Sequence, residues 1–175
     1  MRCYCCSNLP FSSCCEPFLK GQAIPQTAAQ LMRSRFSAYA SKQFEYVLAT
    51  YTKERQPELS VDELTANAAN ATWFALEVGE TGNVSLIAQA EGVAEVATQN
   101  NEGATDTVDF TAYYFENKNL YQLHETSNFI VEDGQWRYHD GILHDDCGKV
   151  KYGRNLPCLC GSGKKFKQCC ATKSR

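Results

Sequence analysis

Residues 120–142 read LYQLHETSNFIVEDGQWRYHDGI and contain the clearest folding signal in the chain. Two segments rich in aromatic and β-branched residues flank Asp133-Gly134, a pair favoured at the centre of a tight hairpin turn. The sequence therefore predicts antiparallel strands over 120–131 and 135–142. From the turn outward, the expected register pairs Val131 with Trp136, Phe129 with Tyr138, and Ser127 with Asp140.

This register places two carboxylates on one otherwise apolar face of the hairpin. Because side chains alternate between the faces of a strand, Glu125 shares that face, opposite Ile142 and diagonal to Asp140 at about 7 to 8 Å. Either acid is a candidate general base in a pocket walled by Trp73, Trp136 and Tyr138.

A structural role for these acids is the alternative. Glu125 or Asp140 would then pair with Arg33 or Arg35 of a preceding helix. We favour this interpretation, because an ion pair explains a buried acid without requiring a substrate. A pocket holding a carboxylate without an arginine partner would favour the enzyme instead.

The histidines are not expected to form a site. His124 and His139 have the opposite parity in their strands and are predicted to face solvent, with no third ligand gathering beside them. His144 lies with Asp145, Asp146 and Cys147 in the link to the C-terminal segment. We interpret that stretch as a solvated linker, with weak metal binding as the alternative.

Helical patterns precede the strands. Thr27 can cap a helix whose apolar residues share one stripe, and Ser60 with Glu63 fits a capping box. The expected helices cover residues 28–39, 44–51 and 61–70, and further strands cover 73–78 and 107–116. Residues 84–104 suit either a helix or a strand and remain open. Helices followed by antiparallel strands predict an α+β domain.

Four cysteines near each end repeat one spacing. Residues 3–15 read CYCCSNLPFSSCC and residues 158–170 read CLCGSGKKFKQCC, so that both follow the pattern C-x-C-x8-C-C. The cysteines in register are Cys3, Cys5, Cys14 and Cys15, and Cys158, Cys160, Cys169 and Cys170. The repeat predicts two tetrahedral all-cysteine sites, separate and at opposite ends of the folded body.

The chemistry of four thiolates favours one zinc ion in each site. A sulfur-only tetrahedron also accepts iron, and the sequence does not choose between the two metals. A closed shell leaves no position for water, so catalytic zinc is not expected. Disulfides are disfavoured, because neighbouring cysteines such as Cys14 and Cys15 are awkward to bridge and the first residues lack the apolar stretch of a secretory signal. We therefore expect a cytoplasmic protein without membrane insertion.

Charge is divided unevenly along the chain. Residues 149–175 hold eight Lys and Arg and no acid, so they carry +8, and the remaining residues sum to −11 because the whole chain carries −3. Three of these cations, Lys164, Lys165 and Lys167, lie inside the second cysteine motif. They either contact an anionic partner or offset the negative charge of the thiolates.

The second cysteine motif resembles the SEC-C motif, named for the metal-binding tail of the SecA translocation ATPase, and residues 152–157 resemble its usual lead-in. The first copy is looser, with Cys6 and Asn8 in place of Gly161 and Gly163, and Cys6 is either a competing ligand or a free thiol. Paired SEC-C motifs around a middle segment of this length resemble the YchJ family, also called UPF0225. The resemblance implies an NTF2-like middle domain, a cone of helices on a curved antiparallel sheet.

We therefore expect three parts: an N-terminal metal knuckle over 1–21, an NTF2-like domain over 22–148 and a C-terminal knuckle over 149–175. The first hypothesis is a non-enzymatic adaptor that contacts a protein or ribonucleoprotein with an acidic surface, and the resemblance implies export machinery or ribosomes. The second is a small-molecule enzyme or ligand binder. Direct nucleic-acid binding ranks lower, because Phe166 is the only aromatic residue near the three lysines.

Overall fold

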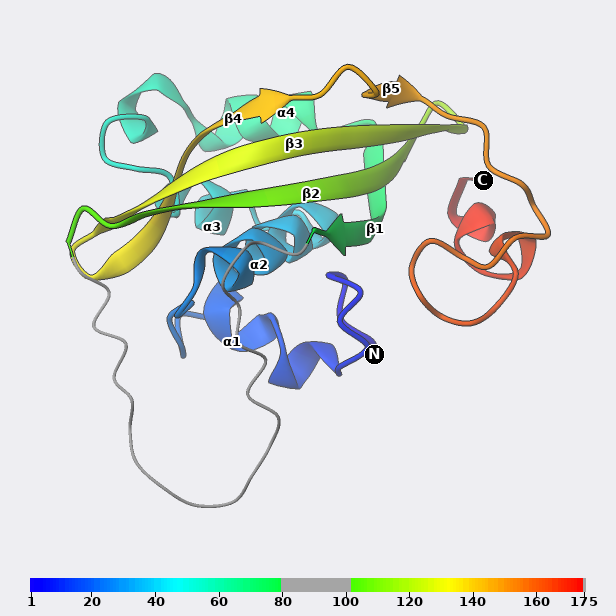
Figure 1. Ribbon diagram of the computed structural model, residues 1–175, viewed down its shortest axis with the longest axis horizontal. Helices are drawn as coiled ribbons and strands as arrows, with labels where there is room; N and C mark the ends of the chain where they lie inside the picture. Colours follow the sequence, from blue (N-terminus) through cyan, green and yellow to red (C-terminus); the bar gives the residue numbers. More distant parts are fainter. Residues whose placement is uncertain (80–101, 175) are drawn as a thin grey trace.

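The computed structural model describes residues 1–79 and 102–174, and residues 84–101 of the segment left open above lie outside them. Four antiparallel strands follow one another in the sheet in chain order, and a short fifth strand pairs with β3 beyond the end of β4 (Figure 1). The strands are β1 Ala71–Val78, β2 Thr105–Glu116, β3 Asn119–Glu132, β4 Gln135–Leu143 and β5 Gly148–Lys149. The helices are α1 Glu16–Leu19, α2 Ala28–Ser41, α3 Phe44–Ala49 and α4 Val61–Asn67, with short 3-10 turns η1 Phe11–Ser13, η2 Gln56–Glu58, η3 Phe166–Gln168 and η4 Cys170–Ser174.

The predicted helix starts are confirmed. The Thr27 side chain accepts a hydrogen bond from the Gln30 backbone, and both bonds of the Ser60–Glu63 capping box are present. Each cap satisfies a backbone N–H that the first helical turn leaves without a partner. Helix α4, expected over residues 61–70, ends at Asn67, three residues before the expected boundary.

The hairpin turn is confirmed, but the register holds only near it. Asp133 and Gly134 both have positive φ, +52° and +71°, as a two-residue hairpin of this handedness requires. Val131 pairs with Trp136 and Phe129 with Tyr138, after which a β-bulge shifts the pairing so that Asn128 faces Asp140.

The predicted pairs Ser127–Asp140 and Glu125–Ile142 are therefore wrong. Ser127 faces Gly141 and Glu125 faces Leu143. The bulge lies next to Tyr138, whose backbone also bonds the chain after α3, donating to the Thr50 carbonyl and accepting from the Thr52 amide. One inserted residue moves every later side chain of β4 to the other face.

Helix α2 covers one face of the sheet, which we call the inner face. Its Leu31, Met32 and Phe36 pack against Val108, Phe110 and other buried strand residues, while α3 and α4 pack on α2 through a separate cluster around Val47 and Leu64. The C-terminal cysteine segment covers part of the opposite, outer face, where it packs against Phe74 of β1, Phe115 of β2 and Leu120 of β3. In the described residues, no helix combines the length and apolar character that a membrane crossing needs.

Candidate metal centres and pocket

The structure brings each set of four cysteines together. In both sets the four sulfurs lie within 4.8 Å of one another, and all ten cysteines of the chain are free thiols. Sulfurs bonded at about 2.3 Å to one tetrahedral ion lie about 3.8 Å apart. The observed separations match: 3.7 Å from Cys5 to Cys14, 3.6 Å from Cys160 to Cys169, and 3.9 Å within each adjacent pair. The donor set therefore fits a thiolate-bound metal ion.

The two clusters, which we call the N-terminal knuckle (residues 3–15) and the C-terminal knuckle (158–170), have the same internal structure. In each, the first cysteine amide donates at 2.8 Å to the carbonyl six residues later, from Cys3 to Leu9 and from Cys158 to Lys164. A serine hydroxyl lies 3.2 Å from the third cysteine sulfur in both, Ser7 beside Cys14 and Ser162 beside Cys169. The sequence repeat is thus a structural repeat.

Cys6 is not a ligand in this arrangement. It adopts a left-handed conformation with φ +60°, as Gly161 does with +69°, and its sulfur points to the backbone carbonyls of Tyr4 and Phe74. Burial raises the pKa of the Cys6 thiol to about 11, so the side chain stays protonated. The prediction of a competing ligand is wrong for this geometry, and the free-thiol alternative holds.

One thiol of each knuckle is readily ionised. Hydrogen bonds from the Cys15 and Cys3 thiols hold the pKa of Cys5 far below its ordinary value. Burial raises the pKa of Cys160, but hydrogen bonds from Ser162 and the neighbouring thiols outweigh it and lower that pKa to about 7. Burial raises the pKa of Cys14 to about 11, and that of Cys158 above its ordinary value, so a metal ion would have to displace the protons of the remaining ligands.

The sequence led us to expect the two knuckles at opposite ends of the folded body. That expectation is wrong. The Arg2 guanidinium donates to the Cys160 and Gly161 carbonyls at 3.3 Å, which places the two knuckles side by side. They are brought together by the sheet, because the N-terminal knuckle shares a core with α2 and the C-terminal knuckle packs beside it on the outer face.

Phe166 anchors the C-terminal knuckle on the sheet. It is 5% exposed and contacts the rings of Phe74 and Phe115 at centroid distances of 6.1 and 6.3 Å. Phe74 reaches the outer face because β1 carries a bulge between Trp73 and Ala75.

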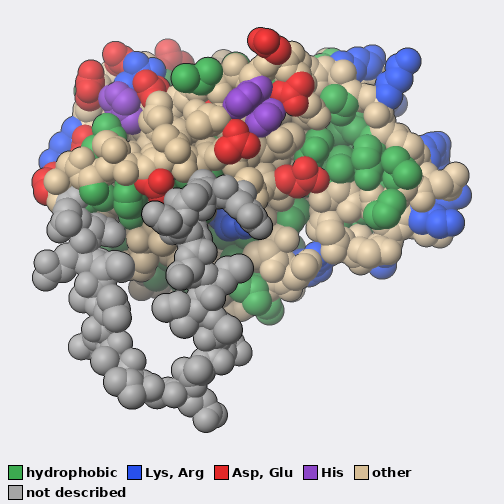
Figure 2. Space-filling view, viewed as in Figure 1, with side chains coloured by type: hydrophobic (Ala, Val, Ile, Leu, Met, Phe, Trp, Pro, Cys, Tyr) green, Lys and Arg blue, Asp and Glu red, His purple; other side chains and the backbone are tan. Residues whose placement is uncertain are grey.

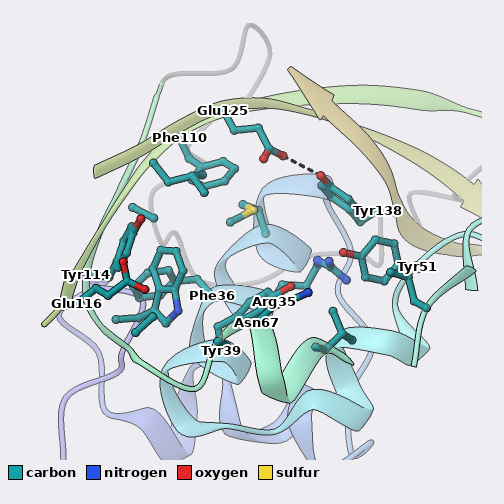
Figure 3. Close-up of a pocket in the computed structure, with 18 residues that line it drawn as sticks. Arg35, Phe36, Tyr39, Tyr51, Asn67, Phe110, Tyr114, Glu116, Glu125 and Tyr138 are labelled. Carbon is teal, nitrogen blue, oxygen red and sulfur yellow. Dashed lines mark hydrogen bonds between the residues drawn. The ribbon is translucent and has the colours of Figure 1, made fainter. Parts of the chain in front are cut away.

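The inner face and the helices enclose a cavity of about 450 Å³ (Figure 3). Glu125 lies at one side of it and accepts hydrogen bonds from the Tyr138 hydroxyl at 2.8 Å and the Ser127 hydroxyl at 2.6 Å. Burial, followed by the charge of Glu125, raises the pKa of Tyr138 and keeps it a hydrogen-bond donor. Trp73 also lines the cavity, and its buried indole N–H has no hydrogen-bond partner.

Three predicted pocket residues lie elsewhere. Asp140 is on the outer side of the bulge and accepts from the Asn128 amide. Trp136 donates its indole N–H to the Gln26 carbonyl, and Arg33 donates to the Cys5 carbonyl of the N-terminal knuckle. Asp140 is misplaced because a bulge cannot be read from strand parity.

Arg35, rather than Arg33, is the arginine of the pocket. It is 4% exposed, donates to the Val47 carbonyl and the Thr50 hydroxyl, and lies over the rings of Tyr51 and Tyr138 at 4.4 and 4.5 Å. Within the described residues, no ion pair joins either arginine to Glu125 or Asp140. The favoured structural ion pair is therefore wrong, and aromatic rings and neutral oxygens stabilise the buried cation instead.

Sequence reasoning missed several other groups that line the cavity. They are Tyr39, Tyr51, Asn67, Tyr114 and Glu116. One signal was available for Arg35, which stands four residues after Leu31 and four before Tyr39 and therefore lies on the apolar stripe of α2. Asn67 and Glu116 come from elements whose meeting in space no local pattern encodes.

The histidines are less exposed than expected, and each contacts other polar groups. The side chain of His124 is 23% exposed and stacks on His144, and both rings lie beside Asp109. The expectation that His124 is not part of a triad of potential ligands is wrong, because β2 brings Asp109 next to β3 and His144 stacks on His124. His139 is also partly covered and lies 3.1 Å from the Thr52 hydroxyl.

Comparison with known proteins assigns the family. Residues 27–141 match the family described as YchJ, middle NTF2-like domain, and residues 154–172 match the SEC-C motif. A UPF0225 protein of Vibrio vulnificus is 37% identical over 179 aligned positions, covering 96% of this chain and 97% of the relative. A UPF0225 protein of Photorhabdus laumondii is 33% identical over 171, covering 96% and 97%.

Two solved structures share the fold. The solution structure of RPA3114, a SEC-C motif containing protein from Rhodopseudomonas palustris, has a TM-score of 0.67 at 27% identity and covers 83% of this chain and all of its own. The crystal structure of a SEC-C motif containing protein from Psychrobacter arcticus has a TM-score of 0.61 at 26% identity, covering 98% and 96%. With these matches over nearly its whole length, the chain belongs to the UPF0225 family, and its fold is an NTF2-like domain flanked by two cysteine knuckles.

Proposed function

We propose that the protein is a metal-stabilised adaptor that binds an acidic protein segment at its C-terminal knuckle. Each knuckle holds one zinc ion in this proposal, with iron as the alternative metal. Zinc supplies the folding free energy that segments of about 20 residues lack, so its role is structural. The sites are closed by four thiolates, and the function lies in the surface that they hold in place.

A groove lined by cations carries the proposal. It has a volume of about 350 Å³ and runs between the C-terminal knuckle and the end of the sheet. Its charged residues, Lys118, Lys149, Arg154 and Lys167, are all basic, and no carboxylate is among the described residues that line it. Phe115, Leu120 and Phe166 contribute apolar surface to the same groove. We call this the basic groove.

The three knuckle lysines extend this surface. Lys164, Lys165 and Lys167 are exposed, and within the described chain their ammonium groups form no hydrogen bond or ion pair with a cysteine or a carboxylate. A surface of one charge next to apolar side chains suits an extended acidic peptide, whose carboxylates gain from Coulomb attraction and whose apolar residues enter the groove. The aromatic residues of the groove are the buried Phe115 and Phe166 and the half-buried Tyr152, so few exposed ring faces are available for base stacking, which disfavours nucleic acid.

The test is binding of a labelled Asp/Glu-rich peptide with interspersed Leu and Phe, followed by fluorescence anisotropy. We expect the Kd to rise at least tenfold in Lys118→Glu/Lys149→Glu/Lys167→Glu. Binding by wild type should weaken with added salt. Lys20→Glu/Lys42→Glu/Lys53→Glu, which reverses three exposed charges away from the groove, is the matched control and is expected to bind like wild type. Equal affinity in the two variants, or tighter binding of a single-stranded RNA than of the peptide, would refute the proposal.

A second candidate function is supported by the cavity. Glu125 has no arginine partner, the Trp73 indole N–H is unpaired, and the buried Arg35 cation lines the same space. A polar small molecule that donates to Glu125 and accepts from Trp73 or Arg35 would satisfy these groups. In this alternative Glu125 is the candidate base.

Gly141 offers a way to test the cavity without changing its chemistry. A methyl group there would overlap the Glu125 side chain, so Gly141→Ala must displace that side chain. Screening a metabolite library by thermal shift should give ligands that stabilise wild type and lose most of their effect in Gly141→Ala and Glu125→Gln. Ligands that stabilise all three proteins equally, or a library without any hit, would exclude this role.

A further inference from the structure

Three metal-ligating side chains meet on the outer face of the sheet, away from both knuckles and the cavity. Asp109 lies on β2, His124 on β3, and His144 directly follows β4. One ligand atom of each lies within 4.8 Å of the others. Figure 2 shows histidine side chains gathered with acidic side chains on this surface.

Their spacing is that of neighbouring ligands on one ion. His124 Nε2 is 3.3 Å from one carboxylate oxygen of Asp109, and His144 Nε2 is 3.3 Å from the other. Two ligand atoms bonded at about 2.1 Å to a tetrahedral ion lie about 3.4 Å apart. The imidazole rings are stacked, at 7° and 3.8 Å between centroids, and both present Nε2 to Asp109.

Asp146 orients one of the two histidines. Its carboxylate oxygens lie 2.9 and 3.1 Å from His124 Nδ1. In the ion-bound state, a proton on Nδ1 donated to this carboxylate would leave the Nε2 lone pair for the metal, in place of its 3.3 Å contact with Asp109, and this is the usual outer support of a metal-binding histidine. Thr126 donates to Asp109 at 2.8 Å and lies 2.8 Å from His144 Nε2, a contact that an ion would replace.

The backbone holds His144 in place although it follows the last long strand. Its amide donates to the His124 carbonyl at 3.0 Å, and the Cys147 sulfur lies 3.2 Å from both the amide nitrogen and the carbonyl oxygen of His124. The turn after β4 is therefore bonded to β3 at the site, and the two histidines are positioned before any ion arrives.

We propose that Asp109, His124 and His144 form a third metal site, which binds an exchangeable divalent transition-metal ion such as Zn²⁺, with Asp146 as the positioning residue of His124. Two imidazoles and one carboxylate suit zinc and its neighbours in the first transition series better than Mg²⁺ or Ca²⁺. Three protein ligands leave a coordination position for water, and the side chain of Asp109 is 47% exposed. The site is thus open, unlike the closed knuckles.

Equilibrium dialysis of the full chain against buffered free Zn²⁺, with elemental analysis, tests the proposal. We expect wild type to bind one more zinc per chain at saturation than His144→Gln or Asp109→Asn. Asp146→Asn should reach the wild-type stoichiometry with an affinity about 10- to 100-fold weaker. His139→Gln removes a histidine outside the site and should match wild type. Equal zinc in wild type and both ligand variants would overturn the assignment.

A measurement on the unaltered protein guards against variants that do not fold. Imidazole ¹⁵N resonances of His124 and His144 should shift as the additional zinc binds, while those of His139 stay in place. A titration that leaves the His124 and His144 resonances in place would rule out binding at Asp109, His124 and His144.

Discussion

At two positions the knuckles share a left-handed backbone but differ in residue type. Cys6 and Asn8 hold φ of +60° and +68°, where the copy has Gly161 and Gly163 at +69° and +73°. A left-handed conformation costs a residue with a Cβ about 1 to 2 kcal/mol more than glycine. The N-terminal knuckle tolerates this cost because its contacts hold the turn, including the Cys6 thiol on the Phe74 carbonyl.

The first prediction is that Gly163→Ala weakens metal binding by the C-terminal knuckle about tenfold. A methyl group at Gly163 meets nothing within 4 Å, so the change adds backbone strain of about 1.4 kcal/mol and no clash. Competition with a chromophoric chelator measures the affinity. Gly103→Ala is the matched control, because Gly103 has φ +76° and open space around its Cβ but lies outside the knuckle. An unchanged affinity in Gly163→Ala would show that the turn is not rigid in the metal-bound form.

Among the elements, α2 connects the most parts of the molecule. Arg33 on this helix donates to the N-terminal knuckle, while Arg35 lines the cavity, and Leu31 and Phe36 lie in the main core. Loosening the start of α2 should therefore reduce the stability of the whole domain rather than fray one end.

The second prediction concerns the cap of α2. Thr27→Ala removes the hydroxyl that accepts from the Gln30 amide at 3.1 Å. We expect the free energy of unfolding to fall by about 1 kcal/mol, measured by urea denaturation. Thr27→Ser keeps the hydroxyl and should retain most of the stability. If Thr27→Ser lost as much as Thr27→Ala, the methyl group rather than the cap would be responsible.

For the molecule as a whole, the two knuckles are built into different cores. Cys3, Cys5 and Cys15 belong to the main core with α2 and the inner face, whereas Cys158, Cys160 and Cys170 pack with Phe74 and Phe115 on the outer face. Loss of metal should consequently have unequal effects at the two ends of the chain.

The third prediction compares two equivalent ligand variants. Cys14→Ser and Cys169→Ser each remove the third cysteine of a knuckle, and both thiols are partly exposed. We expect Cys14→Ser to lower the Tm more, because the N-terminal cluster supports the main core. Thermal unfolding under reducing conditions gives the comparison, and elemental analysis confirms that each variant loses metal. A larger Tm loss in Cys169→Ser would contradict this view of the core.

The sequence predictions that succeeded depend on residues close together in the chain. The hairpin turn, the two capped helices and both cysteine clusters depend on residues within about 13 positions of one another, and the sequence predicts them because such signals are local. The family resemblance, confirmed by the comparisons, rests on the same short motifs. The division into three parts over 1–21, 22–148 and 149–175 stays a prediction.

What only the tertiary structure decided is where these local pieces meet. The β4 bulge removed Asp140 from the cavity, the sheet placed the two knuckles side by side, and pairing of β2 with β3 set Asp109 beside His124. Each outcome depends on how separate elements pack, as in the Tyr138 backbone bonds to Thr50 and Thr52 beside the bulge and the Arg2 contact with Cys160. Residue type and spacing fix a turn or a ligand set, whereas strand register and the packing of distant segments are settled by the free energy of the whole fold.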